Sequence, residues 1–356
     1  MRKRIVTFDD LRDAITAYRL PRVLIAALEL NLFAAIGTNA WTIPALARDV
    51  KVSERGLAIL CRNLAMAGLL KKKGATYTNS RLGATALNAD HPAYRRDYIR
   101  LIISHWADWG RLLESVKSGL PLDHDEPEEP DYRRRFTWAM HHRTLEIAPK
   151  IAGQINLRGA QTLLDLGGGP GTYAMAFLAK NPTLHATVCD RPAALDVARE
   201  IASTHKAGPR LSYLPLDVMT EGIPGSYDVI WYSNVLHIYS PKDNQSLFRR
   251  ALASLNPGGR LLIQDAFLHD RNGLFPEEAS LFAVSMLLFT EGGNTYSAAE
   301  TKTWLEDSGF ERIKVLRMKK GMEDWEDGIL EARSPGTNVK MRARRTGSVK
   351  SLRSRS

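Results

Sequence analysis

From about residue 160 onward, the sequence alternates short apolar runs with amphipathic stretches, and this alternation constrains the fold more than any other feature. Strands and helices alternating at this spacing predict a mostly parallel sheet with helices on both of its faces. Ligands of such sheets bind at the carboxyl ends of the strands. We therefore predict an α/β fold class. The predicted strands are Thr162–Leu166, His185–Cys189, Leu211–Pro215, Tyr227–Ser233, Arg260–Asp265, Arg312–Arg317 and Gly328–Arg333.

A glycine-rich run, LLDLGGGPGT at residues 163–172, includes the first of these strands and leads into a predicted helix. Gly167, Gly169 and Gly171 allow a tight turn and let the backbone approach a ligand closely. A lone run of this kind also occurs in dinucleotide-binding enzymes, so by itself it leaves the ligand open. Asp165 favours a different ligand, because a carboxylate before the glycines disfavours a pyrophosphate and suits a cationic amino-acid group.

Two further aspartates follow the next two strands. Asp190 lies 25 residues after Asp165 and could accept hydrogen bonds from both hydroxyls of a ribose. Asp217 could accept a hydrogen bond from the amino group of adenine, and Val218 and Met219 offer apolar surface to the ring. Each aspartate alone could be a cap or turn residue. Together they indicate S-adenosylmethionine, which is an adenosine that carries an amino acid and no phosphate.

The first 90 residues are predicted to be mostly helical. Apolar residues recur at helical spacing over residues 8–37, and Pro21 is expected to divide this stretch into two helices. A helix capped by Ser53, a stop at Gly68 and a short hairpin follow, which is a winged-helix pattern. A winged helix can bind DNA through a basic recognition helix. Because residues 53–68 are largely apolar, we favour a dimerisation or lid module and expect no nucleic-acid partner.

The formal net charge of +10 would suit a nucleic-acid partner, but the positive charge is concentrated at the two ends of the chain. Residues 333–356 carry eight lysines or arginines and no acidic residue, and residues 1–4 carry three more, so the rest is nearly neutral. Residues 334–356 are predicted to be a disordered basic tail. No apolar run is long enough to span a membrane. Cys61 and Cys189 have no metal-ligand spacing, so we expect no metal site and a cytoplasmic location.

Residues 10–330 resemble the class I S-adenosylmethionine-dependent O-methyltransferases of the plant caffeate and acetylserotonin type, which include bacterial tailoring enzymes. This resemblance implies a Rossmann-like methyltransferase sheet after an all-helical, winged-helix dimerisation domain, and hence a homodimer. The apolar N-terminal helices support a dimer, because a monomer would expose them. The residues that carry the resemblance are DLGGGPG at 165–171, Asp190, LDVM at 216–219, SNVLH at 233–237 and NPGGRLLIQD at 256–265.

The resemblance also implies the catalytic residues. His237 stands where the family has its general base, and Asp265 matches an acid that orients the histidine. A histidine titrates near neutral pH and suits the removal of a proton from a hydroxyl. Ser233 stands at a cofactor-contacting position where plant members have a lysine, and it cannot provide the same cationic contact. The second catalytic glutamate of those members has no equivalent, since Asn294 or Thr295 occupies its place.

The acceptor pocket is expected to draw on one helix before the sheet and on another late in the chain. Phe136 matches a family position that contacts the cofactor. Methionine and aromatic residues at helical spacing are also common in an ordinary core, so each predicted pocket residue could instead be structural. The predicted substrate-binding residues are Met140, Trp138, His141, Met286 and Phe289.

The sequence therefore predicts an S-adenosylmethionine-dependent O-methyltransferase that methylates a hydroxyl of an aromatic or polyketide-like small molecule. Two alternatives remain: an N- or C-methyltransferase with the same fold, and a winged-helix regulator that senses S-adenosylmethionine. The predicted domains are a winged-helix dimerisation domain at 1–90, helical linker and lid segments at 91–156, a catalytic domain at 157–333 and the basic tail at 334–356.

Overall fold

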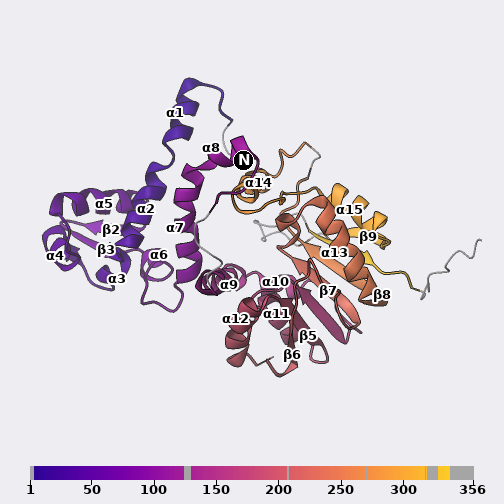
Figure 1. Ribbon diagram of the computed structural model, residues 1–356. Coiled ribbons are helices and arrows are strands. Elements are labelled where there is room, and N and C mark those ends of the chain that lie inside the picture. The colour runs from indigo at the N-terminus through magenta and orange to yellow at the C-terminus, as the bar shows by residue number, and fades with distance from the viewer. Residues whose placement is uncertain are drawn as a thin grey trace, which may run out of the picture.

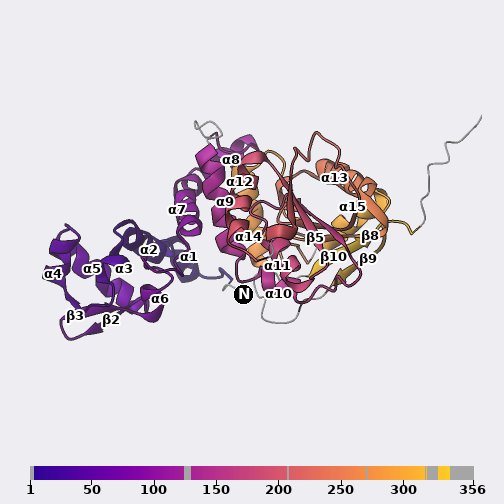
Figure 2. The same ribbon diagram turned by 90° about the horizontal axis from the view of Figure 1, so that it is seen from below.

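The structure is a computed structural model that describes residues 4–123, 130–206, 208–269, 272–316, 318 and 328–336. A mostly helical N-terminal region lies at one end of the molecule and an α/β region at the other, as both views show (Figures 1 and 2). The predicted basic tail lies outside the described residues beyond residue 336. No helix in the described ranges is long and apolar enough to cross a membrane.

The N-terminal region contains the predicted winged helix. Ser53 caps α5 by accepting a hydrogen bond from the amide of Gly56, and an antiparallel hairpin of β2 and β3 follows. A small sheet in the order β1-β3-β2 completes the region. Its elements are α1 (Phe8–Thr16), α2 (Arg19–Glu29), α3 (Leu32–Ile36), β1 (Trp41–Thr42), α4 (Ile43–Asp49), α5 (Glu54–Met66), β2 (Leu70–Lys73), β3 (Thr76–Asn79) and α6 (Arg81–Ala84).

The helices near the N-terminus differ from the prediction in one respect. Residues 8–37 form three helices rather than two, and the first break falls at residues 17–18 instead of Pro21. Pro21 is the third residue of α2, where a backbone N–H would have no partner within the helix, so the proline is tolerated there.

A group of connecting helices lies between the two regions. In Figure 1, α7 separates the N-terminal region from α9. The guanidinium of Arg22 in α2 lies over the ring of Trp106 in α7, 5.1 Å from its centroid, so the N-terminal region contacts this connecting group. Its helices are α7 (Arg96–Gly110), α8 (Leu112–Ser118), α9 (Pro130–Thr144) and α10 (Ala148–Ala152).

A seven-stranded sheet forms the α/β region, in the order β6-β5-β4-β7-β8-β10-β9. The five strands β4 to β8 run parallel, whereas β10 is antiparallel to both β8 and β9. All seven predicted strands are present, and the α/β fold class is confirmed. The strands are β4 (Thr162–Leu166), β5 (His185–Asp190), β6 (Leu211–Pro215), β7 (Tyr227–Ser233), β8 (Leu255–Gln264), β9 (Glu311–Leu316) and β10 (Ile329–Arg333).

Helices cover both faces of this sheet. On one face, a buried cluster joins α10, α11 and α12 to the strands, with the ring of Trp231 against those of Tyr173 and Phe177. On the other face, a second cluster packs α13 and α15 through residues such as Phe248 and Leu305. The α-helices and 3-10 helices (η) of the α/β region are α11 (Thr172–Lys180), α12 (Pro192–Ser203), η1 (Gly208–Arg210), η2 (Leu236–Ile238), α13 (Pro241–Ala253), α14 (Glu277–Phe289) and α15 (Ala298–Asp307).

Candidate active site

The carboxyl ends of the five parallel strands lie along one edge of the sheet, which we call the carboxyl edge. The strand order reverses between β4 and β7, because β5 and β6 lie beyond β4 whereas β8 lies beyond β7. A crevice at such a reversal is the usual ligand site of this fold class. The predicted catalytic residues lie at the ends of these strands or directly after them, and so do all predicted cofactor residues except Phe136. The fold therefore gathers these residues at the carboxyl edge.

The glycine-rich turn after β4 needs glycine at several positions. Gly167, Gly169 and Gly171 have φ angles of +70°, +49° and +69°, which side chains disfavour. A Cβ atom at Gly167 would lie 2.8 Å from Cγ2 of Val235, and one at Gly168 would lie 2.5 Å from Cγ of Asp165. The turn therefore presents bare backbone at the carboxyl edge.

Asp165 lies at the base of this turn with only 2% of its surface exposed. Its Oδ2 accepts a hydrogen bond of 3.2 Å from the amide of Ala174 in α11. Burial raises the pKa of this carboxyl to about 7, and the nearby charge of Asp190 adds to the shift, while the Ala174 amide opposes it. The charged form of Asp165 is thus poorly compensated, and a cation placed beside it would be stabilised.

Asp190 ends β5 and lies directly beside the turn. Its Oδ2 accepts from the amide of Gly169 at 2.8 Å, and its Oδ1 accepts from the amide of Arg191 at 2.7 Å. Burial raises the pKa of Asp190, although both of these hydrogen bonds lower it. The two bonds hold the carboxylate in one orientation next to the glycine backbone.

The segment after β6 holds the other three predicted cofactor residues of this half of the sheet. Asp217 accepts a hydrogen bond from the amide of Met219 at 2.9 Å, so it caps the turn that it begins. Val218 is buried, and both Val218 and Met219 contact the core cluster of α13 and α15. Each of these three residues therefore makes a structural contact, in addition to the role at the adenine that the sequence predicts for it.

The ends of β7 and β8 are joined by polar side chains. Ser233 donates to Oε1 of Gln264 at 2.9 Å and accepts from Nδ2 of Asn234 at the same distance. Asn234 has a φ of +56°, and its amide donates to the carbonyl of Gln264. This network places the strand ends next to each other, immediately before the loop that carries His237.

His237 and Asp265 form a buried pair, although they are 28 residues apart in the chain. Nδ1 of His237 lies 2.7 Å from Oδ1 of Asp265, and the two residues are 7% and 4% exposed. The same Oδ1 accepts from the amide of Ala266 at 2.8 Å. Oδ1 of Asp265 already accepts a hydrogen bond from the amide of Ala266, so it acts as an acceptor towards His237 as well. Nδ1 of His237 is therefore the donor, and in the neutral form of the ring the lone pair is on Nε2.

Helix α14 presents aromatic rings to two histidines. The ring of Phe282 lies edge-on to His237, with 4.8 Å between the centroids, and the ring of Phe289 lies 4.6 Å from that of His105 in α7. Met286, between them in sequence, is 6% exposed. The two predicted residues Met286 and Phe289 therefore belong to a helix that contacts His237.

The four predicted residues of α9 differ in their surroundings. Nδ1 of His141 lies 2.8 Å from the hydroxyl of Thr172, which begins α11 after the glycine turn. Burial, assisted by His142, lowers the pKa of His141 to about 4, so its ring is neutral at pH 7. Trp138 packs against the core cluster to which α10 and α11 contribute. Phe136, which is 38% exposed, and Met140 lie four residues apart and so share a face of α9.

Comparison with known families identifies the chain. Residues 117–311, more than half of the sequence, match the O-methyltransferase domain, and residues 13–89 match the O-methyltransferase dimerisation domain. The chain belongs to the O-methyltransferase family. It is an O-methyltransferase that depends on S-adenosylmethionine, and the family resemblance inferred from its motifs is confirmed.

Several relatives of this O-methyltransferase match over most of its length. The 3-hydroxy-5-methyl-1-naphthoate 3-O-methyltransferase of Streptomyces sahachiroi is 28% identical over 316 residues, which cover 86% of this chain and 90% of the relative. The solved structure of a mitomycin 7-O-methyltransferase is 27% identical, with a TM-score of 0.78 and coverage of 92% and 97%. Human N-acetylserotonin methyltransferase in complex with S-adenosylmethionine shares the fold at 21% identity, with a TM-score of 0.79 and coverage of 94% and 99%.

The carboxyl edge of this O-methyltransferase fits its cofactor. The glycine turn offers backbone without side chains next to Asp190, whose Oδ2 lies 3.9 Å from a Cβ built at Gly169. Asp165 is a buried carboxyl that the amide of Ala174 stabilises weakly, which suits a cationic group. Among the described residues, no group of three or more histidine, cysteine, aspartate or glutamate side chains could hold a metal ion.

Some residues of the site were not predicted. Phe282 lies four residues before Met286 on α14, so the helical period of the predicted pair could have identified it. Thr172 follows the glycine turn directly, and its partner His141 comes from a distant helix. Gln264 precedes Asp265 and bonds Ser233, and only the pairing of β7 with β8 reveals that contact.

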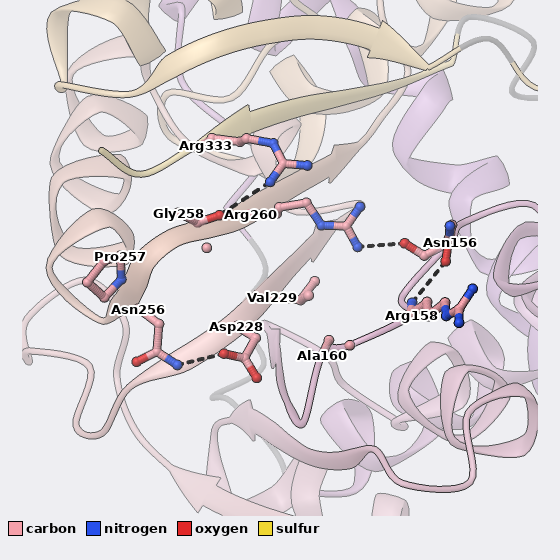
Figure 3. A pocket seen from close by; sticks show the side chains of 12 residues that line it. Asn156, Arg158, Ala160, Asp228, Val229, Asn256, Pro257, Gly258, Arg260 and Arg333 are labelled. Atoms are coloured by element: carbon pink, nitrogen blue, oxygen red, sulfur yellow. Dashed lines mark hydrogen bonds between the residues drawn. The ribbon is translucent and has the colours of Figure 1, made fainter. Parts of the chain in front are cut away.

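A cavity of about 320 Å³ lies at the opposite end of the strands, where β7 begins (Figure 3). Its polar groups are bonded to one another: Asn256 donates to Asp228, Arg260 to the carbonyl of Asn156, and Arg333 to the carbonyl of Gly258. None of the predicted site residues lines this cavity, which we call the amino-edge cavity.

Proposed function

We propose that this O-methyltransferase moves the methyl group of S-adenosylmethionine to a hydroxyl of an aromatic or polyketide-like small molecule, with His237 as general base. The observation that carries the proposal is the buried contact of 2.7 Å between His237 and Asp265, beside the ring of Phe282. The names of relatives that act on a naphthoate and on a mitomycin support an aromatic acceptor of the tailoring type.

His237 would act through its second ring nitrogen. Asp265 accepts a hydrogen bond from Nδ1–H, so Nε2 is free to accept the proton of the acceptor hydroxyl. The positive charge that the ring gains would be stabilised by Asp265, as in other pairs of a base and an orienting acid. Both residues are largely screened from solvent, so few water molecules compete for Nε2.

Cofactor binding would use the carboxyl edge. S-adenosylmethionine supplies a methyl group that is already activated by its sulfonium sulfur. Asp165 would face the amino-acid portion and Asp190 the ribose, while Asp217, Val218 and Met219 would surround the adenine. Ser233 would contact the amino-acid side without a cationic group, and Phe136 of α9 would cover the cofactor. Holding both reactants in line is a large part of what such an enzyme contributes.

The acceptor would lie along α14 and α9. Phe282 and Phe289 are seven residues apart on α14, which is two helical turns or about 10 Å along the axis. This span suits a fused or extended ring system packed between aromatic side chains. Met286 on the same helix and Met140 on α9 would add adaptable apolar contacts, and Trp138 and His141 would limit the pocket on the cofactor side.

Incubation with isotopically labelled S-adenosylmethionine and a panel of hydroxylated aromatic compounds tests this function. The expected product carries one labelled methyl group on oxygen, detected by mass spectrometry and by the loss of the phenol proton signal. A product methylated on nitrogen or carbon would overturn the assignment to a hydroxyl. Tight, salt-sensitive binding to duplex DNA with no methyl transfer would favour a regulator instead.

We infer that the enzyme is a homodimer formed through its helical half. Large apolar side chains are exposed on α1, including Phe8 at 78% and Ile15 at 64%, and on α8, including Leu113 at 63%. A monomer would leave this surface in water. Light scattering at micromolar concentration should give twice the mass of the 356-residue chain, and Ile15→Glu should shift the distribution towards the monomer. A wild-type monomer would overturn the inference.

The predicted partition of the chain is also part of this proposal. Residues 1–90 would dimerise, 91–156 would form the linker and lid, and 157–333 would carry the cofactor and the chemistry. Limited proteolysis should cut first between the first two segments if they are separate units. The buried, unbonded thiols of Cys61 and Cys189 support a reducing, cytoplasmic location.

A further inference from the structure

Two buried polar atoms at the catalytic pair have no hydrogen-bond partner among the described residues. Oδ1 of Asp265 accepts hydrogen bonds from the His237 ring and from the Ala266 amide. Oδ2 of the same carboxylate accepts no hydrogen bond from any of the described residues. The hydroxyl oxygen of Thr295 is also buried and unpartnered there, and Thr295 is 4% exposed. Buried groups of this kind are costly unless a partner satisfies them.

The backbone brings these two atoms into the same part of the molecule. The segment 294–297 runs alongside the segment 265–268: Leu268 donates to the carbonyl of Tyr296 at 2.9 Å, and Leu268 forms a parallel bridge with Ser297. Thr295 therefore precedes this bridge by two residues, and Asp265 precedes it by three. They lie on adjacent segments at nearly the same level.

The same segment is attached to the backbone of the base. The amide of Asn294 donates to the carbonyl of His237 at 2.9 Å, and its side chain accepts from the amide of Thr295 at 2.8 Å. At Gly293 a Cβ atom would lie 2.3 Å from the carbonyl oxygen of His237, so the two backbones are in close contact. The position of Thr295 is thus fixed relative to both members of the catalytic pair.

We propose that Thr295 is a positioning residue for methyl transfer: its hydroxyl and Oδ2 of Asp265 share one bound water molecule. This water accepts a hydrogen bond from the hydroxyl of Thr295 and donates one to Oδ2 of Asp265. The proposal rests on the proposed function of His237, because it concerns how the histidine is held. No direct bond joins these two atoms, and a buried water with polar partners is the usual solution for such a pair.

The water would act on the base through the carboxylate. With both oxygens bonded, the carboxylate of Asp265 cannot turn about its side-chain torsion. The carboxylate then holds Nδ1–H of His237 and leaves Nε2 directed at the acceptor. Loss of the water would leave a charged oxygen uncompensated and the ring less well oriented.

Removal of the hydroxyl tests the inference. Thr295→Val should lower kcat by about tenfold, because the water would lose its second partner and with it the bond to the charged carboxylate, while the calorimetric affinity for S-adenosylmethionine stays within about twofold. Thr295→Ser should restore wild-type kcat. The loss should shrink for acceptors with more acidic hydroxyls, because these need less help from a base. If the valine variant does not fold, Thr295→Ala replaces it with the same expectation.

Two controls test whether Thr295 acts through the histidine. Thr301→Val removes another buried threonine hydroxyl, which donates to the carbonyl of Ser297 at the N-cap of α15, and should leave kcat unchanged. In a His237→Ala background, Thr295→Val should add no further loss, since Thr295 acts through the histidine. A large loss in His237→Ala with normal kcat in Thr295→Val would overturn only the role of Thr295. Full activity of His237→Ala would instead overturn the proposed base.

Discussion

The two edges of the central sheet are both polar, but they use their polar groups differently. At the amino-edge cavity, Asp228 accepts hydrogen bonds from the amides of Gln161 and Thr162, the hydroxyl of Thr162 and the side chain of Asn256. Burial alone would raise the pKa of Asp228, but these bonds outweigh it and lower the pKa. At the carboxyl edge, Asp165 accepts from the amide of Ala174, and its pKa rises to about 7.

This contrast distinguishes, within a single sheet, polar groups that stabilise the fold from polar groups that are available to a ligand. A carboxylate surrounded by donors stabilises the fold and has little left to offer a ligand. A buried carboxylate with few donors is costly in the free protein, and a ligand can recover that cost. The charged side chains at the amino-edge cavity are therefore no guide to function. The raised pKa of Asp165, and Oδ2 of Asp265 without a partner among the described residues, are better guides.

The largest expected effect comes from removing the proposed base at the carboxyl edge. His237→Ala should lower turnover by about 10²–10⁴, the usual contribution of positioned proton transfer. Asp265→Asn should cause a smaller loss, because an orienting residue acts through the base. The rates are measured with a weakly acidic phenol and saturating S-adenosylmethionine.

The affinity of these variants for the cofactor provides the control. It should stay near the wild-type value, since the imidazole would face the acceptor. An inactive His237→Ala enzyme that has also lost its cofactor would mean that the histidine holds the fold of this edge, and the contrast with the amino edge would weaken.

The next effect concerns the cofactor. Asp190→Ala removes the carboxylate beside Gly169 and should weaken the binding of S-adenosylmethionine by about 1–3 kcal/mol, the cost of leaving polar partners unpaired. Calorimetry measures the change, and Glu200→Ala, an exposed residue of α12 paired with Arg134, serves as the matched control. Unchanged affinity in Asp190→Ala would contradict the ribose assignment.

Much of the carboxyl edge could be predicted because strand ends and turns are local in sequence. The three glycines with positive φ, Asp165 and Asp190 all follow apolar runs whose limits are easily recognised. The partnership of His237 and Asp265 came from the family resemblance, since nothing local connects residues 28 apart. Their contact depends on the parallel pairing of β7 with β8.

Other contacts could not be predicted because they join distant segments. The bond of His141 with Thr172 needs α9 to lie beside α11, and the place of Thr295 needs residues 294–297 to lie beside the segment that follows β8. The amino-edge network unites Asn156, Asp228 and Asn256, which carry no shared motif. Such pairings follow from how the elements pack, and the hydrophobic pattern of each element does not specify them.

A moderate effect should appear in the pH dependence of cofactor binding. With a pKa of about 7, Asp165 is mostly protonated at pH 6 and cannot pair with the ammonium group of S-adenosylmethionine. Affinity should therefore rise with pH and level off above about pH 8, and at pH 6 it should be about tenfold below the plateau. Calorimetry between about pH 5.5 and 8.5 measures this, and Asp165→Asn should abolish the slope.

The free energy of unfolding should depend on pH with the opposite sign. Without cofactor, the folded protein keeps the proton of Asp165 where the unfolded chain has lost it, so the free energy of unfolding should fall as the pH rises from about 4 to 7. Chemical denaturation of wild type and Asp165→Asn at several pH values would reveal this slope.

A cofactor affinity that is independent of pH would remove Asp165 from the proposed ammonium site.

The smallest effect on function is expected at the amino edge, and it is the sharpest test of the contrast. Asp228→Asn places an amide where the carboxylate accepts from Gln161, Thr162 and Asn256, and should cost about 1–2 kcal/mol of unfolding free energy. Because the pKa of Asp228 is lowered by folding, this difference should be present at neutral pH and vanish as the pH falls below about 4. Thermal unfolding measures it, while kcat and cofactor affinity should match the wild type at a temperature where both proteins are folded. If Asp228→Asn instead impaired methyl transfer without affecting stability, complete hydrogen bonding would no longer distinguish a structural edge from a functional one.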